Sequence, residues 1–302
     1  MTEQLRHCRL CPRACGVNRM KNRGLCGAND QVEAARASLH MWEEPPITGI
    51  RGSGTVFFSH CSLGCVFCQN RQISCREAFG QTITIPQLAQ IFLSLEREGA
   101  HNINLVTAVH YVPQIINALS LARKAGLSIP VVYNTSSYEC VETLHMLEGW
   151  VDIYLPDYKY YSSYYAARYS RAADYHETAV SAIAEMVRQT GAPQFDENGM
   201  LTRGTIIRHM MLPGLTGDTA QILRDIANRF GDTVLVSLMR QYTPFGVDEW
   251  PELNRTVTNA EYDEACTLFR ELGLGGFFQQ DTAVSESFIP VFDGTGLEDK
   301  SK

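Results

Sequence analysis

Three cysteines carry the clearest chemical signal in this sequence. Cys61, Cys65 and Cys68 follow a Cys-x3-Cys-x2-Cys spacing within HCSLGCVFCQN. A closed 4Fe-4S cluster uses four cysteine thiolates, so three thiolates leave one iron with an open position for a cofactor or substrate. A structural zinc site, a packed apolar run around Val66 and Phe67, and an electron-transfer centre are the alternatives. Because the triplet directly follows a predicted barrel strand, we favour the open cluster.

A second group of cysteines lies near the amino terminus. Cys8, Cys11, Cys15 and Cys26 are spaced Cys-x2-Cys-x3-Cys-x10-Cys in a region with few apolar residues. Four thiolates suit either a structural zinc ion or a second 4Fe-4S cluster, and spacing alone does not separate the two. Unligated thiols are the third interpretation. Basic residues that offset thiolate charge or contact an acidic partner lie among them: Arg13, Arg19, Lys21 and Arg23.

Composition limits the class of protein. The 302 residues, 45% of them hydrophobic, are enough for one large domain with an appendage. The net charge of −7 and the lack of a Lys/Arg run argue against nucleic acid as a partner. Residues 1–30 contain no continuous apolar stretch, so we predict neither a signal peptide nor a membrane span, and we expect a cytoplasmic protein. Clustered cysteines in that reducing compartment indicate metal ligation.

Short β-branched runs alternate with helical patterns after about residue 51, which predicts a parallel sheet. Six runs are predicted strands: Thr55–Ser59, Asn102–Thr107, Pro130–Asn134, Val151–Pro156, Gly204–Met211 and Thr233–Met239. Helix boundary signals between them include Thr84, Gly126, Asp218 and Thr258. Right-handed βαβ units repeated six times predict an α/β fold, a partial (β/α)6 TIM-type barrel with its active site at the carboxyl ends of the strands. We expect a Cys-rich, metal-binding extension at residues 1–52 and a core with a carboxyl-terminal tail at 53–302.

Several segments together resemble a known family. CRLCPRACGVNR, HCSLGCVFCQN, VYNTSSYE, DIYLPDYKY and IIRHMMLPG are similar to segments of the pyruvate formate-lyase activating enzyme-related proteins of the radical SAM superfamily. The glycyl-radical-enzyme activating enzymes are more distant relatives. The resemblance implies a 4Fe-4S cluster that donates an electron to S-adenosylmethionine (SAM), giving methionine and a 5'-deoxyadenosyl radical that abstracts hydrogen. It also implies that Phe67 lies near the adenine, with Asn70 in the same loop.

Polar residues at the ends of the second and third predicted strands are candidates for holding SAM. Many radical SAM proteins have a Gly-Gly-Glu type sequence after the second strand, and close relatives have Thr-Pro-Thr-His; this chain has Thr107 and His110 there. After the third strand, Asn134 and Ser136, with Thr135 between them, have the length to bond ribose hydroxyls or ligate an ion. Turn formation is the competing interpretation.

Charged residues follow the fourth strand and lie within the fifth. Asp157 and Lys159 match an Asp-x-Lys of the activating enzymes, which implies that Asp157 helps to bind a monovalent cation and that Lys159 approaches the SAM carboxylate. Arg208 resembles an arginine that precedes Pro-Gly in those enzymes, and its planar fork suits a carboxylate. Alternation along the strand puts Arg208 and His209 on opposite faces, and we favour Arg208. Gln241 and Tyr242 are weaker candidates on the substrate side.

The sequence therefore predicts an oxygen-sensitive oxidoreductase of the activating-enzyme type, with a flavodoxin- or ferredoxin-type electron donor. The resemblance to glycyl-radical activators favours a protein or peptide substrate. Radical modification of a small molecule is the alternative within enzymes. An iron-sulfur electron-transfer or binding protein that does not cleave SAM is the alternative from another class.

Overall fold

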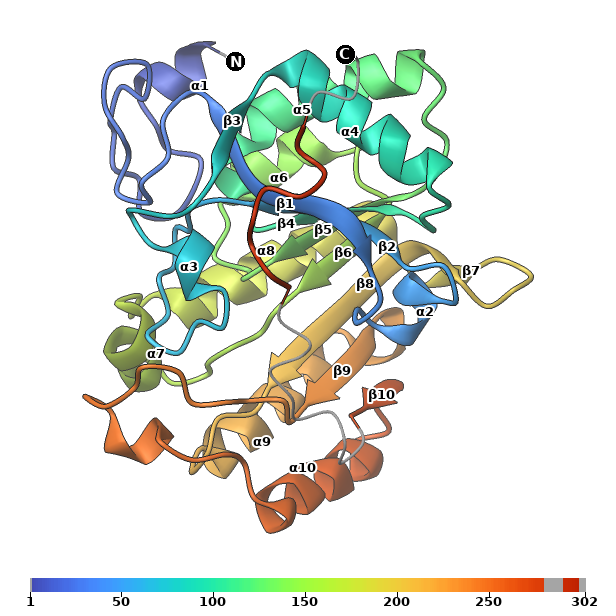
Figure 1. The fold of residues 1–302 in the computed structure, drawn as a ribbon. Helices are drawn as coiled ribbons and strands as arrows, with labels where there is room; N and C mark the ends of the chain where they lie inside the picture. Colours follow the sequence, from blue (N-terminus) through green and yellow to red (C-terminus); the bar gives the residue numbers. More distant parts are fainter. Residues whose placement is uncertain (1, 280–289, 299–302) are drawn as a thin grey trace.

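The computed structural model describes residues 2–279 and 290–298, so part of the expected carboxyl-terminal tail lies outside the described residues. Parallel strands form the centre of the fold, and each predicted run matches one of them: β2 (Ser53–Phe58), β4 (Ile103–Val106), β5 (Val131–Thr135), β6 (Ile153–Pro156), β8 (Leu201–Met210) and β9 (Leu235–Met239). They pair in that order, all parallel, and curve into a partial barrel (Figure 1). The predicted fold class is confirmed.

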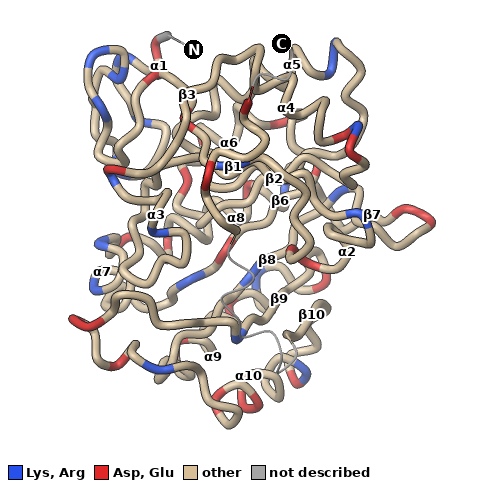
Figure 2. Tube along the Cα trace, viewed as in Figure 1, with Lys and Arg blue, Asp and Glu red and all other residues tan. Residues whose placement is uncertain are grey.

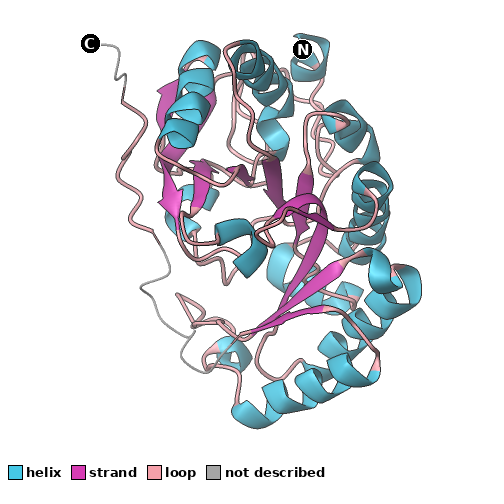
Figure 3. Cartoon of the chain, turned by 90° about the vertical axis from the view of Figure 1, so that its right-hand side faces the viewer, coloured by secondary structure: helices cyan, strands magenta, loops and turns pink. Residues whose placement is uncertain are grey.

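Helices cover the outer side of the barrel (Figure 3). The crossovers contain α4 (Ile85–Arg97), α5 (Val112–Lys124), α6 (Val141–Leu147), α7 (Ser163–Ser170), α8 (Tyr175–Thr190), α9 (Thr216–Arg229) and, after β9, α10 (Asn259–Glu271). Short single turns are α1 (Thr2–Arg6), α2 (Pro45–Thr48), α3 (Arg71–Ser74), η1 (Val109–Tyr111), η2 (Gly231–Thr233) and η3 (Pro251–Leu253). One apolar cluster packs α4 and α5 on β2, β4 and β5, and a second packs α7 to α10 on β8 and β9. No described helix has both the length and the apolar character needed to cross a bilayer.

The sheet extends beyond the six barrel strands. β1 (Val32–His40) pairs antiparallel with β2, and β3 (Gln81–Ile83) pairs with β1. β10 (Gly276–Phe278) pairs with β9, and β7 (Gln194–Phe195) with β8. Residues 32–40, which we assigned to the extension, are thus part of the main sheet. Their Ala-rich sequence VEAARASLH has weak strand propensity, and pairing with β2 outweighs it.

The two ends of the described chain pack on different elements, the first on α6 and the last on β1. Before β1, the chain docks on α6, where the Thr143 hydroxyl donates to the carbonyl of Leu10 (2.9 Å). Basic residues gather in this segment, around α1 at the upper left of Figure 2. The segment 290–298 crosses β1 (Figure 1) through two backbone hydrogen bonds of 2.9 Å, Ala37 N to Thr295 O and Gly294 N to Ala35 O.

A capping box at the start of α4 makes one stability prediction. The Thr84 hydroxyl accepts from the Gln87 backbone N–H (3.3 Å), while the Gln87 side chain accepts from the Thr84 N–H (2.8 Å). Thr84→Ala should lower the free energy of unfolding by about 1 kcal/mol, because a helix-end N–H loses its acceptor. Thr84→Ser, which keeps the acceptor, should stay close to wild type in urea unfolding. Equal unfolding curves for Thr84→Ala and wild type would contradict this role of the cap.

Candidate functional site

One cavity opens at the carboxyl ends of the barrel strands, and it brings together most of the predicted site. Cys61, Cys65 and Cys68 line it. The same wall contains eight further residues singled out from the sequence: Phe67, Asn70, Thr107, Asn134, Ser136, Asp157, Lys159 and Arg208. These residues come from β2, β4, β5, β6 and β8 or from the loops that follow them. Parallel strands place their carboxyl ends at one edge, which is why positions so distant in sequence meet.

Each thiol of the triplet has a hydrogen-bond donor. The Leu63 backbone N–H points at Cys61 Sγ (3.4 Å), the Ser170 hydroxyl at Cys65 Sγ (3.0 Å) and the Ser74 hydroxyl at Cys68 Sγ (3.3 Å). Burial, with the neighbouring Cys68 and Cys65, raises the pKa of the Cys61 thiol to about 12. Thiolates are therefore unfavourable here unless a metal replaces the protons.

The chemistry of this wall fits an iron-sulfur cluster with an open position. Three thiols lie along one cavity, and its described lining contains no fourth cysteine. Nowhere in residues 2–279 and 290–298 are three or more His, Cys, Asp or Glu side chains arranged to hold a single metal ion. A cluster needs a wider arrangement than one ion does, because each thiolate binds a different iron.

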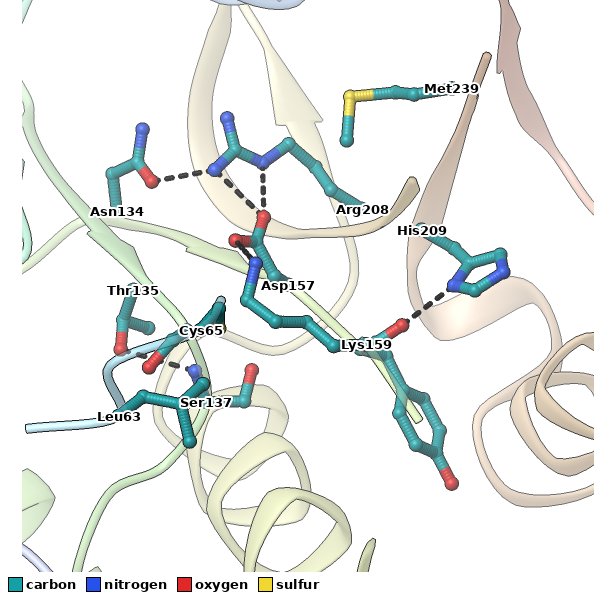
Figure 4. Close-up of polar contacts among 12 residues, drawn as sticks. Leu63, Cys65, Asn134, Thr135, Ser137, Asp157, Lys159, Arg208, His209 and Met239 are labelled. Atoms are coloured by element: carbon teal, nitrogen blue, oxygen red, sulfur yellow. Dashed lines mark hydrogen bonds and ion pairs between the residues drawn. The ribbon is translucent and has the colours of Figure 1, made fainter. Parts of the chain in front are cut away.

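A chain of charged groups lines the same cavity as the thiols (Figure 4). Asp157, just after β6, accepts from Lys159 Nζ (2.7 Å) and from Arg208 Nε (2.8 Å). Arg208 Nη2 also donates to Asn134 Oδ1 (2.7 Å). Burial alone would raise the pKa of Asp157, but Arg208 and Lys159 outweigh it and hold this pKa below its usual range. The carboxylate therefore stays ionised between two cations.

The sequence did not single out two glutamates that enter the barrel. The Glu43 carboxylate accepts from Asn104 Nδ2 (2.9 Å) and lies 3.3 Å from Arg208 Nη1, and Glu44 lies 4.0 Å from Arg208 Nε. Burial raises the pKa of Glu44 to about 7, although Arg208 opposes the shift. The only signal in the sequence was that these two acidic residues precede Pro-Pro. The spacing of the pair does not show that α2 closes the barrel beneath Arg208.

Side chains on the two faces of β8 lie in different surroundings, as the alternation along the strand predicts. Arg208 and Met210 line the cavity. His209 is buried on the other side, with Nδ1 2.7 Å from the Tyr158 carbonyl and Nε2 2.9 Å from the Thr219 hydroxyl on α9. Its imidazole connects β6, β8 and α9, and burial lowers its pKa to about 4.

Gln241 and Tyr242, the weaker candidates after β9, also point to different sides. Gln241 lies in the cavity wall. Tyr242 is buried, and its hydroxyl donates to the Leu253 carbonyl (2.8 Å) while its ring meets that of Phe67 edge-on at 6.0 Å. The position of Tyr242 is therefore that of a packing residue.

The structure does not bring His110 into the cavity wall. This residue lies in η1, where its Nε2 is 2.8 Å from the Ser59 carbonyl and its ring packs on Tyr111 at 4.3 Å. Thr107 has a positive φ of 58° and lines the cavity, and the chain after it turns His110 into the interior. Burial, helped by Arg19, lowers the pKa of His110 to about 3. This position gives no support to a contact between His110 and SAM.

The amino-terminal thiols form a separate group. Cys8 and Cys11 are buried, and Cys15 and Cys26 are partly exposed. A Cβ placed on Gly24 would lie 3.4 Å from Cys26 Sγ and 3.8 Å from Cys15 Sγ, so these two sulfurs flank one glycine. Burial raises the pKa of Cys11 to about 12, and the nearby Cys26 and Cys8 add to the shift. Four thiols thus share one small region outside the cavity.

Comparisons with known proteins agree with this architecture. No protein-family model matches the sequence. The uncharacterized protein MJ0674 of Methanocaldococcus jannaschii is 30% identical over 277 residues, which are 89% of this chain and 76% of MJ0674. HydG, a maturase of the FeFe-hydrogenase, superimposes with a TM-score of 0.51 at 13% identity, over 73% of this chain and 50% of HydG. Methylornithine synthase (PylB) gives a TM-score of 0.48 at 12% identity, over 72% of this chain and 68% of PylB.

The partial barrel, with its cysteine triplet in the loop after β2, has a fold similar to that of HydG. At this level of identity the likeness to HydG concerns the fold, and this chain spans half of the HydG chain. Within that fold, the chain belongs to the family of the uncharacterized protein MJ0674.

The partly buried Glu44 makes stability depend on pH. Its folded-state pKa of about 7 exceeds the ordinary value of 4.5, so the folded protein binds the extra proton. The stability from this group is present below the ordinary pKa and is lost as pH rises towards 7. Glu44→Gln should remove this loss, which is at most about 3 kcal/mol between roughly pH 5 and pH 8.

Urea unfolding at both pH values measures the effect. Glu77→Gln at an exposed glutamate is the control, and it should keep the wild-type pH dependence. A wild-type pH dependence in Glu44→Gln would show that Glu44 is ionised in the folded protein throughout this range.

Proposed function

We propose that this protein is a radical SAM enzyme whose cluster is held by Cys61, Cys65 and Cys68. A 4Fe-4S cluster bound there would supply one electron to SAM and break its sulfur to 5'-carbon bond, giving methionine and a 5'-deoxyadenosyl radical that takes hydrogen from the substrate. One observation carries the proposal: the three thiols share a cavity with the charged chain of Asp157, Lys159 and Arg208. A bare electron-transfer site would not require this chain.

The charged chain suits the amino-acid end of SAM, which carries one amino and one carboxylate group. Lys159 uses one of its three donors on Asp157, so the others can bond a carboxylate. Asp157 is ionised and can attract either the amino group or a monovalent cation. Arg208 is held on three sides by Asp157, Asn134 and Glu43, which orients its guanidinium before any ligand arrives.

The other residues of the wall suit the nucleoside. Phe67 offers an aromatic edge for the adenine, and its ring is fixed by Tyr160 and Tyr242. Asn134 and Ser136 can bond ribose hydroxyls, and Asn70 and Thr107 add polar groups along the same cavity. We propose these as SAM contacts and give His110 no such role.

The amino-terminal thiols are proposed to hold a second metal centre, either zinc or a further 4Fe-4S cluster; a single zinc ion would require these thiols to move closer together than they lie here. Their number and proximity support a four-thiolate site. A flavodoxin- or ferredoxin-type protein is the proposed electron donor.

The proposed substrate is a protein or peptide, on the resemblance to glycyl-radical activators. The rim of the cavity includes Trp42, an aromatic side chain that is 60% exposed and suits contact with a peptide. Modification of a small molecule is the competing proposal. Candidate peptides and metabolites would be added separately, and the release of 5'-deoxyadenosine measured. The class of compound that increases this release would identify the substrate as a peptide or a small molecule.

SAM cleavage tests the proposed function directly. The protein would be reconstituted with iron and sulfide without oxygen, reduced with dithionite and mixed with SAM. We expect 5'-deoxyadenosine and methionine in equal amounts from wild type and none from Cys65→Ala, because one iron loses its thiolate. Cys75→Ala, at an exposed cysteine outside the triplet, is the matched control and should stay active. A wild-type cluster that neither binds nor cleaves SAM would establish the electron-transfer alternative.

Arg208→Lys tests the charged chain. Lysine keeps the positive charge but lacks the planar fork that spreads donors to Asp157, Asn134 and Glu43, so SAM affinity should fall about 10- to 100-fold. SAM titration monitored by the cluster's EPR spectrum measures this, with iron content checked in parallel. Arg224→Lys, at an exposed arginine on α9, should bind SAM as wild type does. Unchanged affinity in Arg208→Lys would remove Arg208 from the SAM site.

A further inference from the structure

One arginine of the amino-terminal cysteine segment reaches the loop of the cysteine triplet. Arg13 lies between Cys11 and Cys15, yet its Nε donates to the carbonyl of Ser62 (3.0 Å) and its Nη2 to that of Leu63 (3.1 Å). Ser62 and Leu63 lie between Cys61 and Cys65. The same guanidinium donates to the carbonyls of Ser170 (2.8 Å) and Arg171.

The two peptide units that Arg13 holds also point at a cluster ligand. The Ser62 carbonyl and the Leu63 N–H belong to one peptide, and this N–H lies 3.4 Å from Cys61 Sγ. The Leu63 carbonyl and the Gly64 N–H belong to the next peptide, and Gly64 also donates to the Cys61 thiol. Arg13 therefore holds the acceptor ends of two peptides whose donor ends converge on the sulfur of Cys61.

Hydrogen bonds of this kind change the chemistry of a cluster. N–H groups directed at a ligating sulfur, and positive charge nearby, stabilise the more negative reduced state and raise the reduction potential. A guanidinium on the carbonyl side polarises the peptide and strengthens the N–H on the other side. Gly64, with a φ of +71°, allows the tight turn that aims both groups.

The amino-terminal segment touches the triplet on its other side as well. Gly27, next to Cys26, packs on His60, next to Cys61; a Cβ on Gly27 would lie 2.7 Å from His60 Nδ1. Glu33 on β1 bonds both His60 Nε2 (2.8 Å) and Arg23 (2.8 Å). The two cysteine-containing segments are thus in contact through residues on both sides of Cys61.

We propose that Arg13 is a positioning residue that sets the reduction potential of the SAM cluster, and that the metal bound by the amino-terminal cysteines holds Arg13 in place. This inference rests on the proposed function. The four-cysteine site would then act on the reaction through Arg13, without passing electrons. Its loss would make the SAM cluster harder to reduce.

Redox titration monitored by EPR of the reconstituted full chain tests this proposal. The signal that changes when SAM is added identifies the cluster of Cys61, Cys65 and Cys68. Arg13→Gln should lower the equilibrium constant for reduction of this cluster at least tenfold. This corresponds to a fall in its reduction potential of about 59 mV for one electron. Arg13→Lys should show part of the shift, because a lysine cannot hold both peptides. Arg9→Gln, at an exposed arginine of the same segment, should keep the wild-type potential.

A double-mutant cycle tests the link to the amino-terminal metal. Cys11→Ser should shift the same signal in the same direction, and Cys11→Ser with Arg13→Gln should shift it no further than Arg13→Gln alone. Additive shifts, or a wild-type potential in Cys11→Ser, would overturn the link.

Failure of this inference can be told from failure of the proposed function. If the wild-type cluster does not respond to SAM, the proposed function is wrong. If it responds and Arg13→Gln keeps the wild-type potential, only the role of Arg13 is wrong. If Arg13→Gln cannot hold the cluster, the reduction potential of the cluster in Arg13→Lys becomes the test. A wild-type potential in Arg13→Lys would then overturn the proposal.

Discussion

The partly buried ion pair between Asp157 and Arg208 joins the two halves of the barrel at the edge where the site lies. β6 and β8 pair over two residues near their amino-terminal ends, and Asp157 and Arg208 form a separate bridge further on. The backbone also connects the two strands here, because the Tyr158 N–H donates a hydrogen bond to the Arg208 carbonyl (2.7 Å). Removing one partner would leave the other charge partly buried without its counter-ion, which destabilises the fold. The positions of Lys159, Asn134 and Glu43 all depend on this pair.

The barrel is closed from below by its own amino-terminal chain. β1 runs antiparallel to β2, and the segment between β1 and α2 brings Glu43 and Glu44 to Arg208. Glu43, Glu44 and Asp157 place three carboxyl groups around the Arg208 guanidinium. The pKa of Glu44 is raised chiefly because burial desolvates its carboxyl group; Glu43 and Asp157 add to the shift, and Arg208 opposes it.

How much of this was predictable depends on the range of the interactions involved. The six β-branched runs indicated the barrel strands because each run is buried on both faces, which is a local pattern. β1 was missed because its Ala-rich sequence has little strand propensity of its own. His110 was misplaced because the turn after Thr107, with its positive φ, rotates the following residues inward.

The sequence by itself determined the cysteine spacings, the strand order along the chain and the polar residues at strand ends, because all of these are properties of neighbouring residues. Only the tertiary structure decided that Glu43 and Glu44 meet Arg208, and that Arg13 reaches the peptides beside Cys61. These contacts join positions 49 to 165 residues apart. Such distant pairs are fixed by how whole elements pack, and no local pattern in the sequence records that packing.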